Sequence, residues 1–131
     1  MKTYLDTSAL AKLVVRENES EALRHYLGEI ATDTLFTAAL SRTELVRAVR
    51  RAGADAITKA RSVLASLDTI NLTNNLLDAA ADLEPAQLRS LDAIHLAAAQ
   101  RAAADLRVLI TYDMRMSDAA QSLGIPVAAP A

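Results

Sequence analysis

Short apolar runs alternate along the chain with longer stretches that have helical periodicity. Residues 3–5, 35–37 and 108–111 are the clearest strand candidates, because each is a short uncharged run of aliphatic, aromatic or β-branched residues. Weaker candidates lie at 69–72 and at 125–127. The last of these contains a proline, which cannot donate to a central ladder, so we expect it at a sheet edge.

The stretches between these runs predict helices. Ser8 is a candidate cap for the first helix, and Gly28 is expected to end the second. The third begins at Ser41, whose spacing from Glu44 is that of a capping box. Further helices are expected at about 55–67, 74–84, 92–104 and 114–123. Strands separated by helices favour one α/β domain with a mostly parallel sheet covered on both faces.

The composition is that of an ordinary globular domain, with 52% hydrophobic residues in a chain of 131. The absence of cysteine excludes disulfides and thiolate metal sites, and it fits a reducing cytoplasm. The longest uncharged run, 119–131, is too short to cross a membrane, so we expect a soluble cytoplasmic protein with no membrane partner. The net charge of −2 neither indicates nor excludes a nucleic-acid substrate.

Four acidic residues occupy related places in the predicted α/β pattern. Asp6 follows the first strand, and Asp113 follows the strand at 108–111. Asp92 begins a helix, and Glu44 lies in the first turn of another. In a parallel sheet, strand ends and the helix starts that follow them share one rim, where ligands bind. The four carboxylates are therefore expected to face one site, although they are spread over more than a hundred residues.

Such a cluster must be protonated, opened out or neutralised by a cation. Two carboxylates about 5 Å apart repel each other by about 3 kcal/mol at an effective dielectric constant of about 20. A site whose ligands are carboxylate oxygens, with no group of histidines and cysteines, favours a hard cation, Mg²⁺ or Mn²⁺. Each acid could instead be only a helix cap or a first-turn residue. It is the combination that indicates metal-dependent transfer of a phosphoryl group to water.

Four segments resemble the motifs of one family, in the correct order along the chain. They are residues 4–10, 41–45, 91–99 and 109–113, with Ala119-Ala120 and Leu123-Gly124 after the last. This set is similar to the PIN-domain ribonucleases, specifically the VapC toxins of VapBC toxin–antitoxin pairs. The resemblance implies a single PIN domain over 1–131 and a PIN-like three-layer α/β/α sandwich.

The resemblance also implies a function and partners. Mg²⁺ or Mn²⁺ would be held by Asp6 and Asp92, helped by Glu44 and Asp113, all four acids being catalytic. The activity would be endonucleolytic cleavage of RNA, commonly tRNA or a ribosomal RNA loop, which inhibits translation. A homodimer is expected, together with a VapB-type antitoxin that blocks the site.

Other residues near the motifs are candidates for substrate binding. Ser8 and Thr111 are placed to hydrogen-bond a ligand carboxylate or a phosphate. Arg42 and Arg115 could contact RNA phosphates. His95 lies three residues after Asp92 but is interpreted as a packed histidine, and the resemblance gives it no metal role.

Two alternative functions remain open. An α/β phosphohydrolase with an aspartyl nucleophile also places an aspartate after its first strand, but it usually has a second acid two residues later, where Ser8 stands here. A PIN-like scaffold that binds RNA or protein without cleavage would be expected to lack some of the acids, and all four are present.

Overall fold

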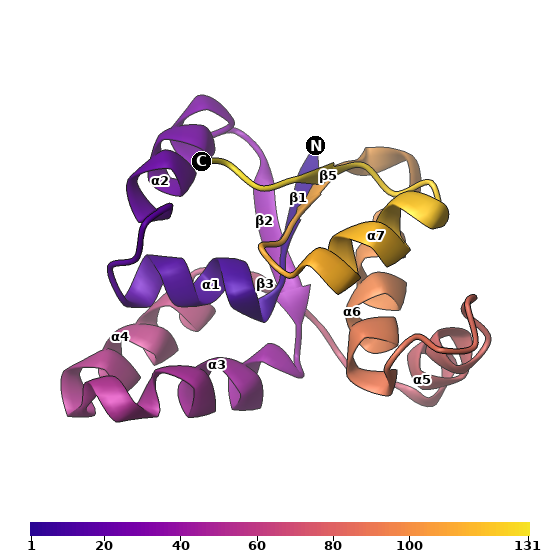
Figure 1. The fold of residues 1–131 in the computed structure, drawn as a ribbon, viewed down its shortest axis with the longest axis horizontal. Helices are drawn as coiled ribbons and strands as arrows, with labels where there is room; N and C mark the ends of the chain where they lie inside the picture. Colours follow the sequence, from indigo (N-terminus) through magenta and orange to yellow (C-terminus); the bar gives the residue numbers. More distant parts are fainter.

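The structure, a computed structural model, describes all residues from 1 to 131 (Figure 1). The strands are β1 (Lys2–Leu5), β2 (Thr34–Ala38), β3 (Asp68–Ile70), β4 (Leu106–Ile110) and β5 (Val127–Ala128). The helices are α1 (Thr7–Val14), α2 (Ser20–Glu29), α3 (Ser41–Val49), α4 (Ala54–Ala65), α5 (Asn74–Ala81), α6 (Ser90–Gln100) and α7 (Met114–Ser122), with short 3₁₀ helices at Arg50–Ala52 and Ala103–Asp105. No helix is long and apolar enough to cross a membrane.

The five strands form one sheet in the order β3-β2-β1-β4-β5, and every pairing is parallel. The chain starts in the middle of the sheet, moves outward through β2 to β3, and then crosses to the other side for β4 and β5. The strand order therefore reverses between β1 and β4, which is where ligands bind in open parallel sheets. The predicted α/β class with a parallel sheet is confirmed.

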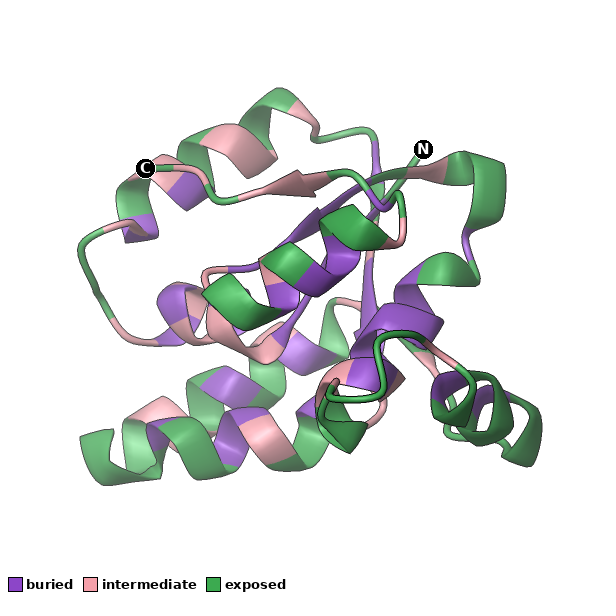
Figure 2. Cartoon of the chain, turned by 45° about the vertical axis from the view of Figure 1, so that its right-hand side comes forward, coloured by how far each residue is buried: buried purple, intermediate pink, exposed green.

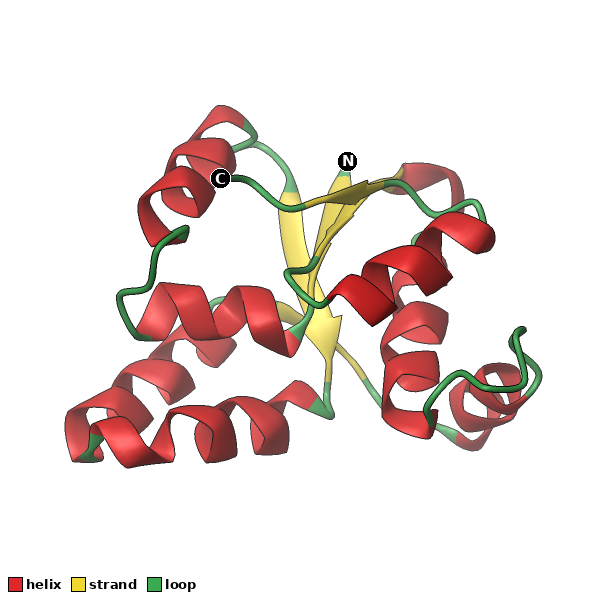
Figure 3. Cartoon of the chain, viewed as in Figure 1, coloured by secondary structure: helices red, strands yellow, loops and turns green.

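Helices cover both faces of this sheet, with α1–α4 on one side and α5–α7 on the other (Figures 1 and 3). Successive side chains of each strand point to opposite faces of the sheet, so the core has two parts, one beneath each layer of helices. Tyr4 and Leu109 belong to the core beneath α5–α7, whereas Leu5 and Ile110 belong to the core beneath α1–α4. Buried residues line the inward faces of the helices, as Figure 2 shows. The three-layer α/β/α sandwich is thus confirmed.

Three expected helix signals are wrong. Asp6, not Ser8, caps α1, because its carboxylate accepts the backbone N–H that opens the helix. Gly28 lies within α2 and does not end it. The capping box at Ser41 does not form, because the Ser41 hydroxyl pairs with the buried hydroxyl of Thr37 at 2.7 Å. The carboxylate of Glu44, which would have closed the box, is available for other contacts.

Candidate active site

Asp6 lies at the carboxyl end of β1, almost fully buried, with its backbone N–H donating to the carbonyl oxygen of Ile110 at 3.2 Å. Its Oδ1 accepts from the Ser8 hydroxyl at 2.7 Å and from the Ala9 N–H at 3.0 Å. Its Oδ2 accepts from the Thr111 hydroxyl at 2.5 Å. Burial raises the pKa of Asp6, and these three hydrogen bonds act in the opposite direction. Asp6 is therefore a carboxylate held in one orientation.

Ser8 and Thr111 both hold the carboxylate of Asp6. Each hydroxyl donates to Asp6, and each oxygen also accepts a backbone N–H, from Tyr112 at 2.9 Å and from Asp113 at 3.1 Å respectively. These bonds match the predicted contact with a ligand carboxylate. A contact with a phosphate, which would have to replace one of these bonds, stays a prediction.

Asp113 is both the cap of α7 and an acid at the site. Its Oδ1 accepts the backbone N–H groups of Arg115 at 2.9 Å and Met116 at 3.4 Å. Its Oδ2 makes no hydrogen bond, and the side chain is exposed. Capping therefore uses one oxygen and leaves the other available, so the two interpretations of this residue are compatible.

Asp92 lies in the first turn of α6 and is half-buried, with no hydrogen bond to its carboxylate. Burial raises its pKa most, and the negative charges of Asp113 and Asp6 raise it further. The nearby His95 and Arg89 act in the opposite direction. The structure thus brings the three aspartates within electrostatic reach of one another, as the topology predicted.

Glu44 joins the site from α3 through two hydrogen bonds. Its Oε1 accepts from the Thr7 hydroxyl at 2.7 Å and lies 2.6 Å from Nε2 of His95. Its Oε2 has no partner. Burial raises the pKa of Glu44, but the bonds to His95 and Thr7 outweigh it, and the net pKa is lowered. Glu44 is held by groups beside the aspartates: Thr7 follows Asp6, and His95 lies one turn after Asp92.

Comparison with known proteins identifies the family. The PIN domain family model matches residues 3–121. The chain belongs to the PIN-domain family. Ribonuclease VapC46 of Mycobacterium tuberculosis is 50% identical over 127 residues, which are 97% of this chain and 96% of that protein. Ribonuclease VapC35 of the same species is 43% identical over 129 residues, with the same shares covered. The motif resemblance to VapC ribonucleases is confirmed.

Solved structures share the PIN fold of this chain at low sequence identity. VapC20 of Mycobacterium tuberculosis, described as a sarcin–ricin loop cleaving toxin, has a TM-score of 0.76 at 17% identity and covers 98% of this chain and 99% of its own. VapBC2 of Rickettsia felis, bound to a promoter DNA fragment, has a TM-score of 0.72 at 13% identity and full coverage of both chains. A toxin–antitoxin complex from Klebsiella pneumoniae has a TM-score of 0.70 at 22% identity, with 98% of each chain covered.

VapC ribonucleases of the PIN-domain family generally depend on a divalent metal ion. The carboxylates of this PIN domain fit such an ion by their chemistry, because Asp92, Oδ2 of Asp113 and Oε2 of Glu44 offer oxygens without a protein partner. No three acidic or histidine side chains converge closely enough to hold an ion among themselves. Mg²⁺ is usually held by one or two carboxylates and several waters, so a closed protein cage is not required. The four-acid shell remains a prediction.

His95 is the residue whose contacts at the site sequence reasoning missed in this PIN domain. It is 3% exposed, as expected of a packed histidine, yet both ring nitrogens are engaged: Nδ1 with the Tyr4 hydroxyl and Nε2 with Glu44, each at 2.6 Å. Because His95 lies three residues after Asp92, the sequence predicted it on the same face of α6 as Asp92. The partners lie 91 and 51 residues away, so no local pattern indicates them.

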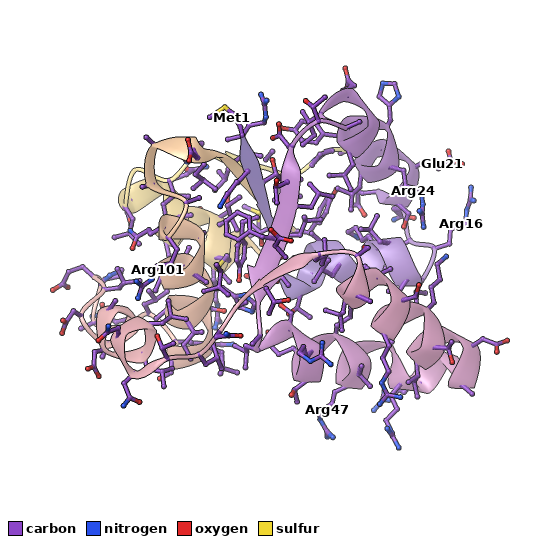
Figure 4. All side chains as sticks on the ribbon, turned by 180° about the vertical axis from the view of Figure 1, so that it is seen from behind. Met1, Arg16, Glu21, Arg24, Arg47 and Arg101 are labelled. Atoms are coloured by element: carbon purple, nitrogen blue, oxygen red, sulfur yellow. The ribbon has the colours of Figure 1, made fainter.

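A cavity of about 460 Å³ opens beside Asp92. Arg89 and Arg115 both line it, and neither forms an ion pair. Arg115 was predicted as a substrate contact, whereas Arg89, directly before α6, was not. Arg42 is exposed near the start of α3 with no hydrogen bond or ion pair, and Arg47 further along projects away from the body of the protein (Figure 4).

Proposed function

We propose that this PIN domain is a VapC-type endoribonuclease toxin that hydrolyses phosphodiester bonds in RNA with Mg²⁺ or Mn²⁺ and thereby inhibits translation. The observation that carries the proposal is the electrostatic coupling of Asp6, Asp92 and Asp113 at the carboxyl ends of β1 and β4. It occurs in a chain that is half identical to ribonuclease VapC46. The proposed substrate class, tRNA or a ribosomal RNA loop, comes from the resemblance of the motifs to VapC toxins.

The acidic residues of the proposed ion site have different roles. A divalent ion bound here would lower the pKa of a water molecule and offset negative charge on the phosphodiester. Asp6, fixed by three hydrogen bonds, supplies a position that does not move. Asp92 has no competing partner, and a cation would relieve the repulsion that raises its pKa. We assign Asp6 and Asp92 as direct ligands, with Glu44 and Asp113 acting directly or through water.

The cavity beside Asp92 is the proposed path of the RNA strand. Arg89 and Arg115 present guanidinium groups that form no ion pair, and a guanidinium can bind a phosphate through two parallel hydrogen bonds. They lie next to the acid at which the scissile phosphate would be placed. Arg42, exposed on α3, would contact the strand further along. Phosphate contacts of this kind position the RNA without reading its sequence.

A VapB-type antitoxin is the proposed protein partner, and the chain would act as a homodimer in the cytoplasm. The fold shared with two toxin–antitoxin structures supports the antitoxin. Induced expression of the toxin alone should arrest growth, and coexpression of a small DNA-binding protein encoded directly upstream should restore it. Light scattering of the purified protein measures whether it is a dimer.

The activity is tested with Asp6→Asn and Asp92→Asn in pure protein with Mg²⁺. Each should lower the rate of RNA cleavage at least about a hundredfold, because each removes a charge from the proposed ion site. Asp78→Asn is the matched control, since Asp78 is exposed on α5 and makes no hydrogen bond or ion pair. Wild-type cleavage rates in both site variants would overturn the proposal. Wild-type protein that binds RNA without cutting it would indicate the scaffold function.

A further inference from the structure

The buried ring of His95 connects Glu44 to the interior of the protein. The hydroxyl oxygen of Tyr4, itself fully buried, accepts the backbone N–H of Ala38 at 3.1 Å and lies 2.6 Å from Nδ1 of His95. On the other side of the ring, Nε2 lies 2.6 Å from Oε1 of Glu44. These groups form a continuous chain of hydrogen bonds that runs from the backbone of β2 through β1 and α6 to α3.

The direction of each bond follows from the donors and acceptors in the chain. Tyr4 is fully buried, and burial raises the pKa of its phenol, so the hydroxyl keeps its proton. Its oxygen accepts from Ala38, and the hydroxyl pairs with Nδ1 of His95. On the other side of the ring, a carboxylate oxygen can only accept, so Nε2 carries a proton and donates it to Glu44. The ring of His95 is thus held at both nitrogens.

The consequence for Glu44 is a carboxylate with two different oxygens. Oε1 accepts from His95 and from Thr7, at 2.6 and 2.7 Å. Oε2 has no protein donor. The two bonds come from different helices, α6 and α1, and together they restrict rotation of the carboxylate. Of the two oxygens, Oε2 is therefore the one that can face an ion or its water shell.

The position of His95 on α6 relates this carboxylate to Asp92. His95 lies three residues after Asp92, so one turn of α6 presents both side chains. Glu44 lies on α3, on the opposite face of the sheet from α6. The bond between His95 and Glu44 thus connects the helical layers on the two faces of the sheet, at the end of the strands. It holds Glu44 next to α6, the helix that carries Asp92.

We propose that His95 is a positioning residue for Glu44, and that its Nε2–H orients the carboxylate so that Oε2 remains available to a divalent cation or the water around it. Tyr4 supports this role by holding the other nitrogen of the ring. His95 itself contacts neither the ion nor the RNA. The inference rests on the proposed metal-dependent function. Groups that orient metal ligands in this way are commonly worth about ten- to a hundredfold in metal affinity or activity.

Two substitutions of His95 separate its two hydrogen bonds. The amide of Gln lies near the position of Nε2 and can still donate to Glu44, whereas the shorter amide of Asn lies near Nδ1 and reaches only Tyr4. His95→Asn should weaken Mn²⁺ binding, measured by calorimetry, about tenfold and slow RNA cleavage about ten- to a hundredfold. His95→Gln should recover both to within about threefold of wild type. His25→Asn is the control, because His25 is exposed on α2.

A double-mutant cycle shows whether His95 acts through Glu44. In a Glu44→Gln background, His95→Asn should weaken Mn²⁺ binding by no more than about twofold further, since the carboxylate to be oriented is already gone. A full tenfold loss in that background would overturn the proposal. If the His95 variants fail to fold, Tyr4→Phe replaces them. It should weaken Mn²⁺ binding about threefold, and unchanged binding would contradict the inference.

The proton on Nε2 gives a readout independent of activity. Nitrogen NMR of the wild-type protein should show Nε2 of His95 protonated, and an unprotonated Nε2 would overturn the inference. Failure of the proposed role of His95 can be distinguished from failure of the proposed ribonuclease function. Mn²⁺ binding and cleavage that depend on Asp6 and Asp92 but not on Glu44 would reject the role of His95 alone. A wild-type protein that neither binds Mn²⁺ nor cleaves RNA would reject the proposed function.

Discussion

The Thr111 hydroxyl donates to Oδ2 of Asp6 across the ends of two neighbouring parallel strands, with 2.5 Å between the two oxygens. The bond joins residues 105 positions apart in the chain, and both are buried. It links the end of β4 to the acid that follows β1, at the point where the strand order reverses. The sheet itself therefore holds Asp6 in place at this point.

Removal of this hydroxyl should affect stability and activity together. Thr111→Val preserves the shape of the side chain but leaves Oδ2 of Asp6 without its donor, and a hydrogen bond to a charged group contributes about 2 kcal/mol. We expect a loss of about that size in the free energy of unfolding, measured with urea, and a lower rate of RNA cleavage. Thr111→Ser retains the donor and should stay within about 1 kcal/mol of wild type. Equal stability of the Val and Ser variants would contradict this role.

The two roles of Asp113 can be separated by substitution. Asn caps helices about as well as Asp, so Asp113→Asn should change the free energy of unfolding by less than about 0.5 kcal/mol. The same variant removes the charge beside Asp92 and should slow RNA cleavage about tenfold or more. Asp113→Ala removes cap and charge and should cost about 1 kcal/mol in addition. Wild-type cleavage by the Asn variant would show that Asp113 is only a cap.

An ion cluster at the opposite end of the sheet predicts a pH dependence of stability. The buried carboxylate of Asp33 accepts from Nε and Nη2 of Arg107 at 2.5 and 2.9 Å and from the Thr3 hydroxyl at 3.0 Å. The terminal amine of Met1 lies 3.8 Å away. The guanidinium of Arg107, with the Thr3 hydroxyl and the other charges, lowers the pKa of Asp33, although burial opposes this. The ionised form is therefore the one that stabilises the fold.

The sign of the effect follows from this lowered pKa. The stabilisation is complete above the ordinary pKa of aspartate, about 4, and is lost as the pH falls through the lower pKa of the folded state. Asp33→Asn should lower the free energy of unfolding at pH 7, measured with urea, because it removes the ionised partner of Arg107, whose side chain is partly exposed. The difference between wild type and variant should shrink below pH 4. A difference that grows on acidification would contradict this interpretation.

The sequence predicted the strands and the four acids because both depend on local pattern. Asp6, Asp92 and Asp113 could be placed on one rim once the strands were assigned as parallel. The partners of these acids could not be predicted in the same way. The Ser41 pattern suggested a local cap, but the buried Thr37 hydroxyl competes for that side chain. His95 pairs with Tyr4 and Glu44 only through the packing of three separate elements.

Arg89 and Arg115 should contribute to RNA affinity through phosphate contacts at the cavity beside Asp92. Each phosphate contact releases counterions, so its removal should weaken RNA binding and lower the magnitude of the salt slope by about 0.7 for single-stranded RNA. Arg89→Ala and Arg115→Ala are each expected to show both effects, measured by fluorescence anisotropy in an Asp6→Asn background that prevents cleavage. Cleavage by the otherwise wild-type enzyme should then show a raised KM and a nearly unchanged kcat.

Arg101, labelled in Figure 4, provides the matched control for Arg89. The two arginines flank opposite ends of the same helix, α6. Arg101 is exposed, forms no ion pair and lies at the end away from Asp92. Arg101→Ala removes the same charge from the protein and should leave the salt slope as it is. If Arg89→Ala and Arg101→Ala lowered affinity equally, the effect would come from net charge, and the cavity beside Asp92 would not be the path of the RNA.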